Sequence, residues 1–186
     1  MCCNCQGIFL DAKLLPDDNR EVQRYLSHNN DVEDARYQSF VDPIVSNVLR
    51  DFPPTAKGLD FGAGTGPVIS KLLKDRNYSI MQYDPFFHNH PHLLSAKYNY
   101  IACCEVIEHF HSPQKEFSLL KDILLPQGKL YCMTDIYNPT IEFNNWYYKN
   151  DPTHVFIYQE ETFLWIKGYF GFSNVAIDGR LIMFQK

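Results

Sequence analysis

The hydrophobic and polar positions of this chain follow two alternating periods. Short apolar runs bounded by Gly or Pro predict β-strands at 56–61, 79–83, 98–104 and 129–134. Between and around these runs, apolar residues recur every three or four positions, which predicts helices at 31–51, after residue 67, at 113–124 and at 159–170. Residues 174–186 predict a β-hairpin with its turn at Asp178-Gly179. Strands that alternate with helices indicate an α/β fold, with a mostly parallel sheet covered on both faces and a closing antiparallel hairpin.

Two parts of this pattern are less regular. Residues 1–30 predict an irregular N-terminal segment, so we place one domain at 31–186, with a long loop at 135–157. The helix at 31–51 contains Asp42-Pro43. Proline lacks a backbone N–H and is best tolerated in a first helical turn, so a kink or two short helices are expected there.

Three glycines at alternate positions follow the first strand: Gly62, Gly64 and Gly66, just before the helix that opens at Pro67. Glycines allow unusual backbone dihedrals and close approach of a ligand. A dinucleotide fingerprint requires glycine at its sixth position. Here that position is Pro67, which lacks the N–H that a pyrophosphate would bind, and the carboxylate of Asp60 would repel a pyrophosphate and attract an amino group. The turn therefore favours a nucleoside cofactor that carries an amino group.

Asp84 ends the second strand, 22 residues after Gly62. This is close to the offset of about 20 residues at which a carboxylate reaches ribose hydroxyls. Alternatively, Asp84-Pro85 is an ordinary turn pair. Dinucleotide enzymes share this carboxylate, so Asp84 indicates nucleoside binding without separating the cofactor classes.

A third polar segment follows the strand at 98–104 and contains Glu105, Glu108 and His109. Ligands of parallel sheets bind beyond the carboxyl ends of the strands, which is where these side chains are expected. Alternatively, they cap or hydrogen-bond the loop, and for His109 we favour that structural role over proton transfer.

These segments together resemble the class I S-adenosylmethionine-dependent methyltransferases. The stretch Gly58 to Pro67 is similar to motif I of that family, and Glu105 to His109 (EVIEH) is similar to its segment after the fourth strand. The runs at 125–130 (LPQGKL) and 146–155 (WYYKNDPTHV) resemble a compact bacterial branch, and the resemblance extends from about residue 31 to 186. It implies a Rossmann-like three-layer sandwich and S-adenosylmethionine as cofactor, with S-adenosylhomocysteine as product. The cofactor-binding residues it implies are Asp60, Gly62, Ala63, Gly64, Gly66, Asp84, Pro85, Cys104 and Glu105.

The chain departs from the family pattern in two places. Only 13 residues lie between Asp84 and Tyr98, too few for the usual helix and third strand, so the sheet is expected to lack that strand. Phe86 and Phe87 are candidates for stacking on the adenine. At the N-terminus, Cys2 and Cys5 form half of a zinc ribbon. A structural zinc needs four ligands, so this metal site is incomplete and is expected to be a remnant or a half shared with another chain.

The composition and charge of the chain limit the kinds of partner that are expected. The 186 residues carry a formal net charge of −5 and are 45% hydrophobic, which indicates a globular protein and argues against a nucleic-acid partner. We find no apolar stretch of 18 or more residues and no signal-peptide pattern, so we expect a cytoplasmic protein with no membrane partner. The sequence does not indicate an oligomeric state. A small-molecule acceptor is therefore preferred, and protein methylation stays open.

Methyl transfer depends chiefly on alignment of the nucleophile with the methyl group. The candidate catalytic residues are His154 and Asp151, on the 135–157 loop where acceptors dock in the family; a role in holding the loop is the alternative, and we favour it for His154. Two other functions were weighed. A catalytically silent cofactor-binding scaffold is disfavoured by the intact glycines and acids, and an NAD-dependent oxidoreductase is disfavoured by Pro67.

Aromatic side chains gather in the 135–157 loop and predict either an acceptor pocket or a loop core: Phe143, Trp146, Tyr147, Tyr148 and Phe156.

Overall fold

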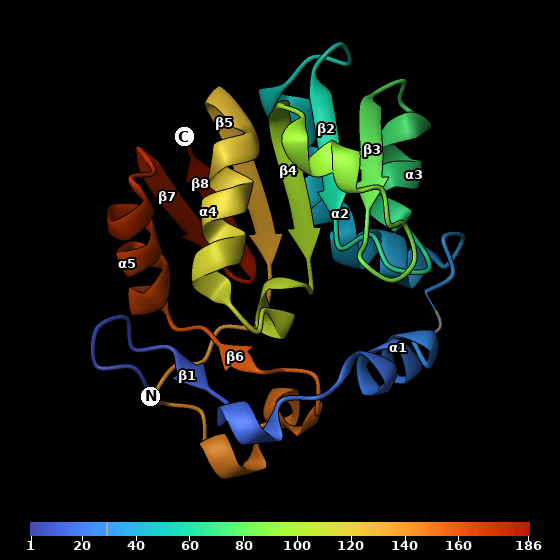
Figure 1. Ribbon diagram of the computed structural model, residues 1–186. Helices are drawn as coiled ribbons and strands as arrows, with labels where there is room; N and C mark the ends of the chain where they lie inside the picture. Colours follow the sequence, from blue (N-terminus) through green and yellow to red (C-terminus); the bar gives the residue numbers. More distant parts are fainter. Residues whose placement is uncertain (29) are drawn as a thin grey trace.

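The computed structural model describes residues 1–28 and 30–186. Its main sheet contains, within that range, six strands in the order β3 (Ser79–Tyr83), β2 (Lys57–Phe61), β4 (Tyr98–Cys104), β5 (Leu124–Met133), β8 (Leu181–Gln185) and β7 (Asn174–Asp178). The first four are parallel, whereas β8 is antiparallel to both of its neighbours. The arrowheads of the parallel strands all point to one edge of the molecule, where the N-terminal helix α1 (Asp18–Leu26) lies (Figure 1).

Helices cover both faces of this sheet. One face packs against α2 (Ala35–Asp51) and α3 (Val68–Lys74), whose Ile44, Val48 and Leu73 are fully buried. The other face packs against α4 (Pro113–Ile123) and α5 (Glu160–Phe170), which bury Phe117 and Phe163. The predicted three-layer sandwich is confirmed. Between Asp84 and Tyr98 the described residues form the short 3₁₀ helix η2 (Pro91–Ser95) and no strand, so β3 is the edge of the sheet.

Of the two alternatives predicted for 31–51, that of two short helices was wrong, because α2 is one helix that continues through Pro43; a kink at Pro43 stays a prediction. Asp34 caps this helix by accepting a hydrogen bond from the N–H of Arg36 (2.8 Å). Pro43 and Ser39, whose carbonyl loses its usual partner at a proline, are both exposed, so water can satisfy that carbonyl.

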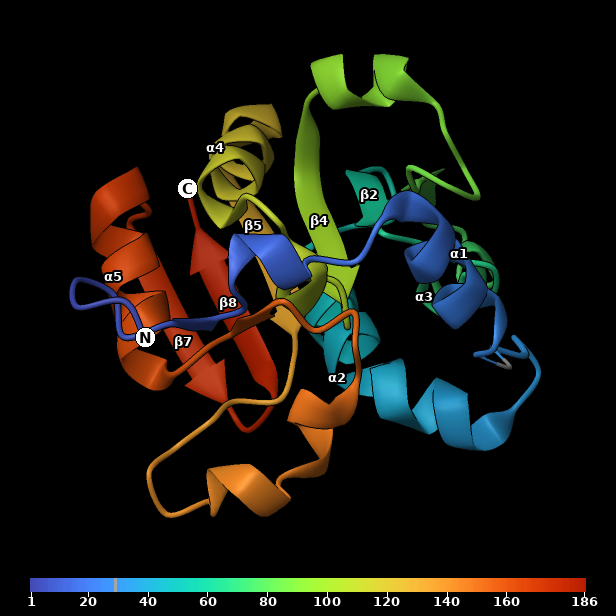
Figure 2. The same cartoon turned by 60° about the horizontal axis from the view of Figure 1, so that its bottom comes forward.

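The N-terminal segment is more ordered than predicted. The Asp17 side chain accepts a hydrogen bond from the N–H of Arg20 and so caps α1 (2.9 Å). Upstream, η1 (Ala12–Leu14) follows β1 (Ile8–Phe9), which pairs antiparallel with β6 (Phe156–Ile157). Gly7 permits this contact, since a Cβ there would lie 2.3 Å from the ring of Phe156. Figure 2 shows the segment crossing beside the orange 135–157 loop; the domain boundary at residue 30 stays a prediction.

The 135–157 loop contains two short 3₁₀ helices, η4 (Phe143–Asn145) and η5 (Tyr147–Asn150). Trp146 and Tyr148 are buried together with Ile157 and pack against Phe143, so much of the aromatic group forms the core of the loop. Tyr147 is 63% exposed, because its side chain points away from that core.

Two further boundaries differ from the prediction. β5 starts at Leu124, because Leu124 pairs with Tyr98 ahead of an irregular stretch. The hairpin loop is Gly179-Arg180, since Asp178 pairs with Leu181.

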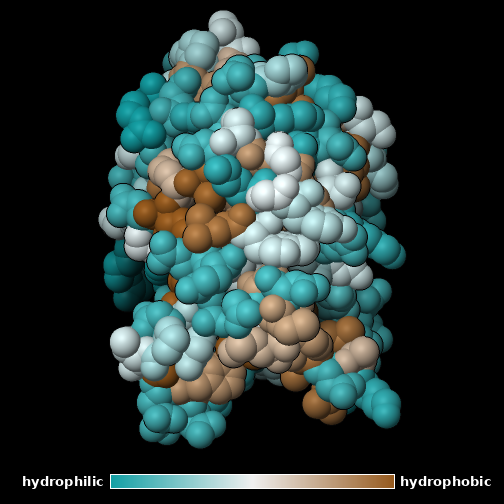
Figure 3. Space-filling model, turned by 90° about the vertical axis from the view of Figure 1, so that its left-hand side faces the viewer, coloured by the Kyte–Doolittle hydropathy of each residue, from teal (hydrophilic) through white to brown (hydrophobic). Residues whose placement is uncertain are grey.

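Seen from the side of α5 and β7, the surface is mainly hydrophilic with separate hydrophobic patches (Figure 3). Leu164 and Tyr169 are exposed on α5.

Candidate functional site

A cavity of about 350 Å³ lies at the carboxyl ends of the parallel strands, bordered by α1. The turns after β2, β3 and β4 each contribute to its wall, as expected for ligand sites of open parallel sheets. Of the predicted cofactor-binding residues, seven line the cavity: Gly62, Ala63, Gly64, Asp84, Pro85, Cys104 and Glu105.

The glycines of the turn after β2 have different roles. Gly62 and Gly64 both adopt positive φ angles, +77° and +60°. A Cβ on Gly62 would lie 2.4 Å from a methyl carbon of Val106, so the packing of Val106 requires glycine at this position. A Cβ on Gly64 would meet no described atom within 4 Å, and therefore Gly64 leaves open space in the cavity. Gly66 is not part of the wall, because its Cα faces the carbonyl of Asn30, 1.8 Å from where a Cβ would be.

Asp84 is buried and organises the turns around the cavity. One carboxylate oxygen accepts hydrogen bonds from the N–H groups of Phe86 and Phe87 (2.9 and 3.0 Å), and the other accepts one from Gly64 (3.0 Å). The ordinary turn role is thus present at a residue that also lines the cavity. Phe86 and Phe87 line the cavity beside it.

Asp60 is not part of the cavity wall. Its buried carboxylate accepts a hydrogen bond from the hydroxyl of Ser70 in α3 (2.7 Å), and burial raises the pKa of Asp60 to about 6. Because side chains alternate along β2, Asp60 faces the α3 layer, and its role in cofactor binding stays a prediction.

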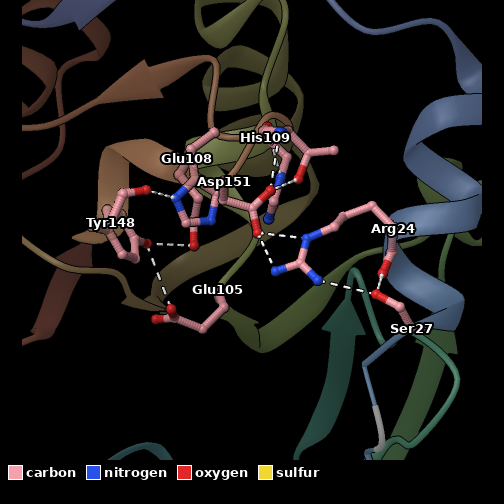
Figure 4. Close-up of polar contacts among 9 residues, drawn as sticks. Arg24, Ser27, Glu105, Glu108, His109, Tyr148 and Asp151 are labelled. Carbon is pink, nitrogen blue, oxygen red and sulfur yellow. Dashed lines mark hydrogen bonds and ion pairs between the residues drawn. The ribbon is translucent and has the colours of Figure 1, made fainter.

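A polar cluster adjoins the cavity where the turn after β4 meets the 135–157 loop (Figure 4). The hydroxyl of Tyr148 donates to a carboxylate oxygen of Glu108 (2.5 Å), and burial raises the pKa of Glu108 to about 7. Glu105, which has a positive φ of 52°, forms an ion pair with Arg180 of the hairpin loop (2.8 Å). Burial, together with the neighbouring Glu108, raises the pKa of Glu105 against the effect of Arg180.

His109 attaches the 135–157 loop to this turn, and His154 forms a hydrogen bond within the loop itself. Nδ1 of His109 lies 2.8 Å from the carbonyl oxygen of Thr153, and Nδ1 of His154 lies 2.7 Å from that of Tyr148. Their ring centroids are 5.0 Å apart. Burial lowers the pKa of each imidazole to about 4, so both rings are neutral at neutral pH.

Asp151 is held by other groups and is not free to act as a base. Arg24 of α1 lies 2.7 Å from its carboxylate, and the N–H and hydroxyl of Thr153 donate to the other oxygen (Figure 4). Burial opposes ionisation, but the hydrogen bonds from Arg24 and Thr153 keep the pKa of Asp151 well below its usual range.

Sequence reasoning missed the contribution of α1, from which Glu21 and Tyr25 line the cavity. The available signal was Asp17-Asp18, a capping pair ahead of a polar stretch of helix-forming residues.

At the N-terminus, the Cys2 and Cys5 thiols are adjacent, and hydrogen bonds from the backbone of Cys5 and Asn4 lower the pKa of Cys2. Within the described residues, no third metal-ligating side chain forms a cluster with that pair.

The comparisons with known proteins agree with this geometry. A methyltransferase domain model matches residues 33–177, more than half of the chain. Among curated proteins, none matches significantly. No described helix is both long and apolar enough to cross a membrane.

Solved structures share the fold at low sequence identity. A 1,6-didemethyltoxoflavin-N1-methyltransferase from Burkholderia thailandensis superimposes with a TM-score of 0.66 at 13% identity, over 100% of this chain and 98% of that one. A SAM-dependent methyltransferase from Archaeoglobus fulgidus gives 0.62 at 18% identity, over 80% and 94%. Magnesium protoporphyrin IX methyltransferase from Synechocystis gives 0.58 at 15% identity, over 90% and 94%. The chain therefore belongs to the class I methyltransferase family, and its cofactor is S-adenosylmethionine.

Proposed function

We propose that this methyltransferase acts on a small-molecule acceptor without phosphate groups, bound in the cavity between the glycine turn and α1. The observation that carries this proposal is the composition of the cavity wall. Aromatic side chains and the carboxylates of Glu21, Asp84, Glu105 and Glu116 line it, and none of the described lining residues is Lys or Arg. A nucleic-acid acceptor would require cations for its phosphates.

The residues present fit the cofactor. The open space at Gly64 admits a ligand against the backbone, and the carboxylate of Asp84 lies beside that space with its oxygens already oriented by three N–H groups. We assign nucleoside binding to Gly62, Gly64 and Asp84, with Phe86 and Phe87 as the aromatic wall. Bound there, S-adenosylmethionine supplies an electrophilic methyl group on its sulfonium.

The contribution of the protein is alignment and exclusion of water. α1 borders the cavity through Tyr25, and Arg24 attaches that helix to the loop through Asp151. With Asp151 held by its partners and both histidine Nδ1 atoms engaged, we assign His154 and Asp151 to positioning of the loop. Such positioning supplies rate by holding a nucleophile in line with the methyl group.

Two structural neighbours are consistent with a small acceptor: one has 1,6-didemethyltoxoflavin bound with S-adenosylhomocysteine, and the other is a magnesium protoporphyrin IX methyltransferase. The same fold therefore accommodates small acceptors in other proteins.

The test is a screen for S-adenosylhomocysteine release with a panel of aromatic amines, phenols and carboxylic acids, run against phosphorylated counterparts, a protein extract and RNA. We expect turnover with a non-phosphorylated small molecule and its loss in Gly64→Val. Turnover with RNA or protein alone would contradict the acceptor class. Tight binding of S-adenosylmethionine without turnover on any acceptor would favour the scaffold.

A further inference from the structure

Three side chains with possible metal-ligating atoms converge beside the cavity: Glu108, His109 and His154. Each offers one possible ligand atom, and these atoms all lie within 4.8 Å of one another. Glu108 and His109 come from η3 (Ile107–His109), the turn after β4, and His154 comes from the 135–157 loop. The fold therefore brings a carboxylate and two imidazoles to one point.

The hydrogen bonds of both histidines leave their other ring nitrogen available. A carbonyl oxygen can only accept, so Nδ1 of His109 donates to Thr153, and Nδ1 of His154 donates to Tyr148. In a neutral ring, Nε2 then carries the lone pair. Metal-binding histidines are usually fixed in this way, with the second nitrogen donating to a carbonyl or carboxylate.

Glu108 supplies an independent observation. Its side chain is fully buried, and Oε1 accepts the hydrogen bond from Tyr148. Among the described residues, Oε2 has no hydrogen-bond partner. A buried carboxylate oxygen without a partner is costly, and a cation would remove that cost.

We propose that Glu108, His109 and His154 form a binding site for one divalent transition-metal ion, for which Zn²⁺ is the probe. Two imidazole nitrogens and one carboxylate oxygen are a ligand set suited to Zn²⁺ with one position left open. A harder cation such as Mg²⁺ prefers oxygen ligands, so it is disfavoured.

The site lies between two cavities. His109 lines the cavity of the glycine turn, and His154 lines a second one of about 370 Å³ with Arg24, Tyr147 and Asp151. An ion there joins the 135–157 loop to η3. Binding to the folded state alone stabilises that state, so metal should raise the melting temperature. This inference does not depend on the acceptor.

The experiment uses the full-length protein, freed of metal with a chelator and titrated with Zn²⁺ by calorimetry and with Co²⁺ by absorption. Because Cys2 and Cys5 are also metal-binding thiols, every measurement is made in a Cys2→Ser/Cys5→Ser background. We expect one ion per chain, a rise in melting temperature, and a Co²⁺ spectrum without a sulfur-to-metal charge-transfer band.

Two variants test the ligands. His154→Ala should weaken Zn²⁺ binding at least ~10-fold. Glu108→Gln should do the same while keeping an oxygen for Tyr148, and it serves if His154→Ala does not fold. His90→Ala, a surface histidine outside the cluster, is the matched control and should leave affinity unchanged. Absence of saturable binding in the serine background, or equal affinity in the folded variants and the control, would overturn the proposal.

Discussion

The guanidinium of Arg24 lies 2.7 Å from the carboxylate of Asp151, and this ion pair attaches the N-terminal helix to the loop that contains His154. Arg24 also donates to the hydroxyl of Ser27, the C-cap residue of α1 (3.0 Å). Because α1 borders the cavity through Glu21 and Tyr25, the ion pair couples the order of α1 to the completeness of the cavity wall.

Replacing Arg24 should therefore loosen α1 more than it weakens the rest of the fold. Arg24→Gln leaves the largely buried Asp151 without its cation, and we expect a loss of about 1 kcal/mol, roughly 3 °C in melting temperature. Hydrogen–deuterium exchange should rise in 18–26 and stay unchanged in β4 and β5. Arg20→Gln, an exposed change on the same helix, is the control. Equal exchange in the two variants would show that the pair does not anchor α1.

The sequence predicted the strands of the sheet but not the position of α1 against the loop. Strands β3 and β4 were predicted to the residue. β4 is a buried, nearly continuous apolar run, whereas β3 is an edge strand whose end was marked by Asp84-Pro85. The position of α1 was not predictable, since Arg24 and Asp151 are separated by 127 positions and nothing local pairs them. The same holds for Glu108, whose partner Tyr148 comes from a loop without periodicity.

In the candidate site, too, some features could be predicted from the sequence and others could not. The turn after β2 was predictable because positive φ selects glycine at specific positions, whereas the direction in which Asp60 points depends on how β2 packs against α3. Pro43 illustrates the opposite error, in which a local signal for two helices is outweighed by the packing of α2, on which Pro43 lies at an exposed position.

Gly64→Val tests whether the cavity is the cofactor site. A branched side chain would enter the open space, and positive φ would add strain of about 1–2 kcal/mol. We expect no detectable S-adenosylmethionine binding by calorimetry, with a circular dichroism spectrum like that of the wild type. Gly171→Val imposes similar strain at the C-cap of α5, outside the cavity wall, and is the matched control. If the two variants bind equally well, the cofactor lies elsewhere.

Asp84→Asn should affect binding and stability together. The substitution keeps one oxygen but places an NH₂ group opposite N–H groups that now donate to Asp84. Because charge-assisted hydrogen bonds are worth about 1.5–3 kcal/mol each, we expect at least ~10-fold weaker S-adenosylmethionine binding. Asp75→Asn, at the exposed end of α3, is the control. A variant that loses stability but binds within twofold of the wild type would limit Asp84 to its turn role.

Gly168→Ala should stabilise the protein. Gly168 lies inside α5 and is exposed, and a Cβ there would meet no described atom within 4 Å. Replacing an interior helical glycine with alanine gains about 0.5–1 kcal/mol, because glycine loses more backbone freedom on folding. Urea denaturation should show a higher midpoint at an unchanged slope. A lower midpoint would mean that α5 is packed against something that the alanine disturbs.

Asp51 gives a stability difference with a defined pH window. Partial burial opposes ionisation, but hydrogen bonds from Arg50, Lys129 and Tyr131 lower its pKa from 3.8 to about 2. A carboxyl whose pKa is lower in the folded state stabilises that state above its unfolded pKa, and the contribution is lost as the pH falls toward the folded pKa.

Asp51→Asn should therefore be less stable than the wild type by about 2 kcal/mol at pH 7, since each pKa unit corresponds to about 1.4 kcal/mol. The difference should hold down to about pH 5, halve near pH 3, and nearly vanish at pH 2. Urea denaturation of both proteins across this range measures it, and comparing them cancels the other carboxyls. Asp122→Asn, at an exposed position of α4, should show no such window. A difference between wild type and Asp51→Asn that stays constant from pH 7 to pH 3 would mean that Asp51 contributes through packing or neutral hydrogen bonds and not through its charge.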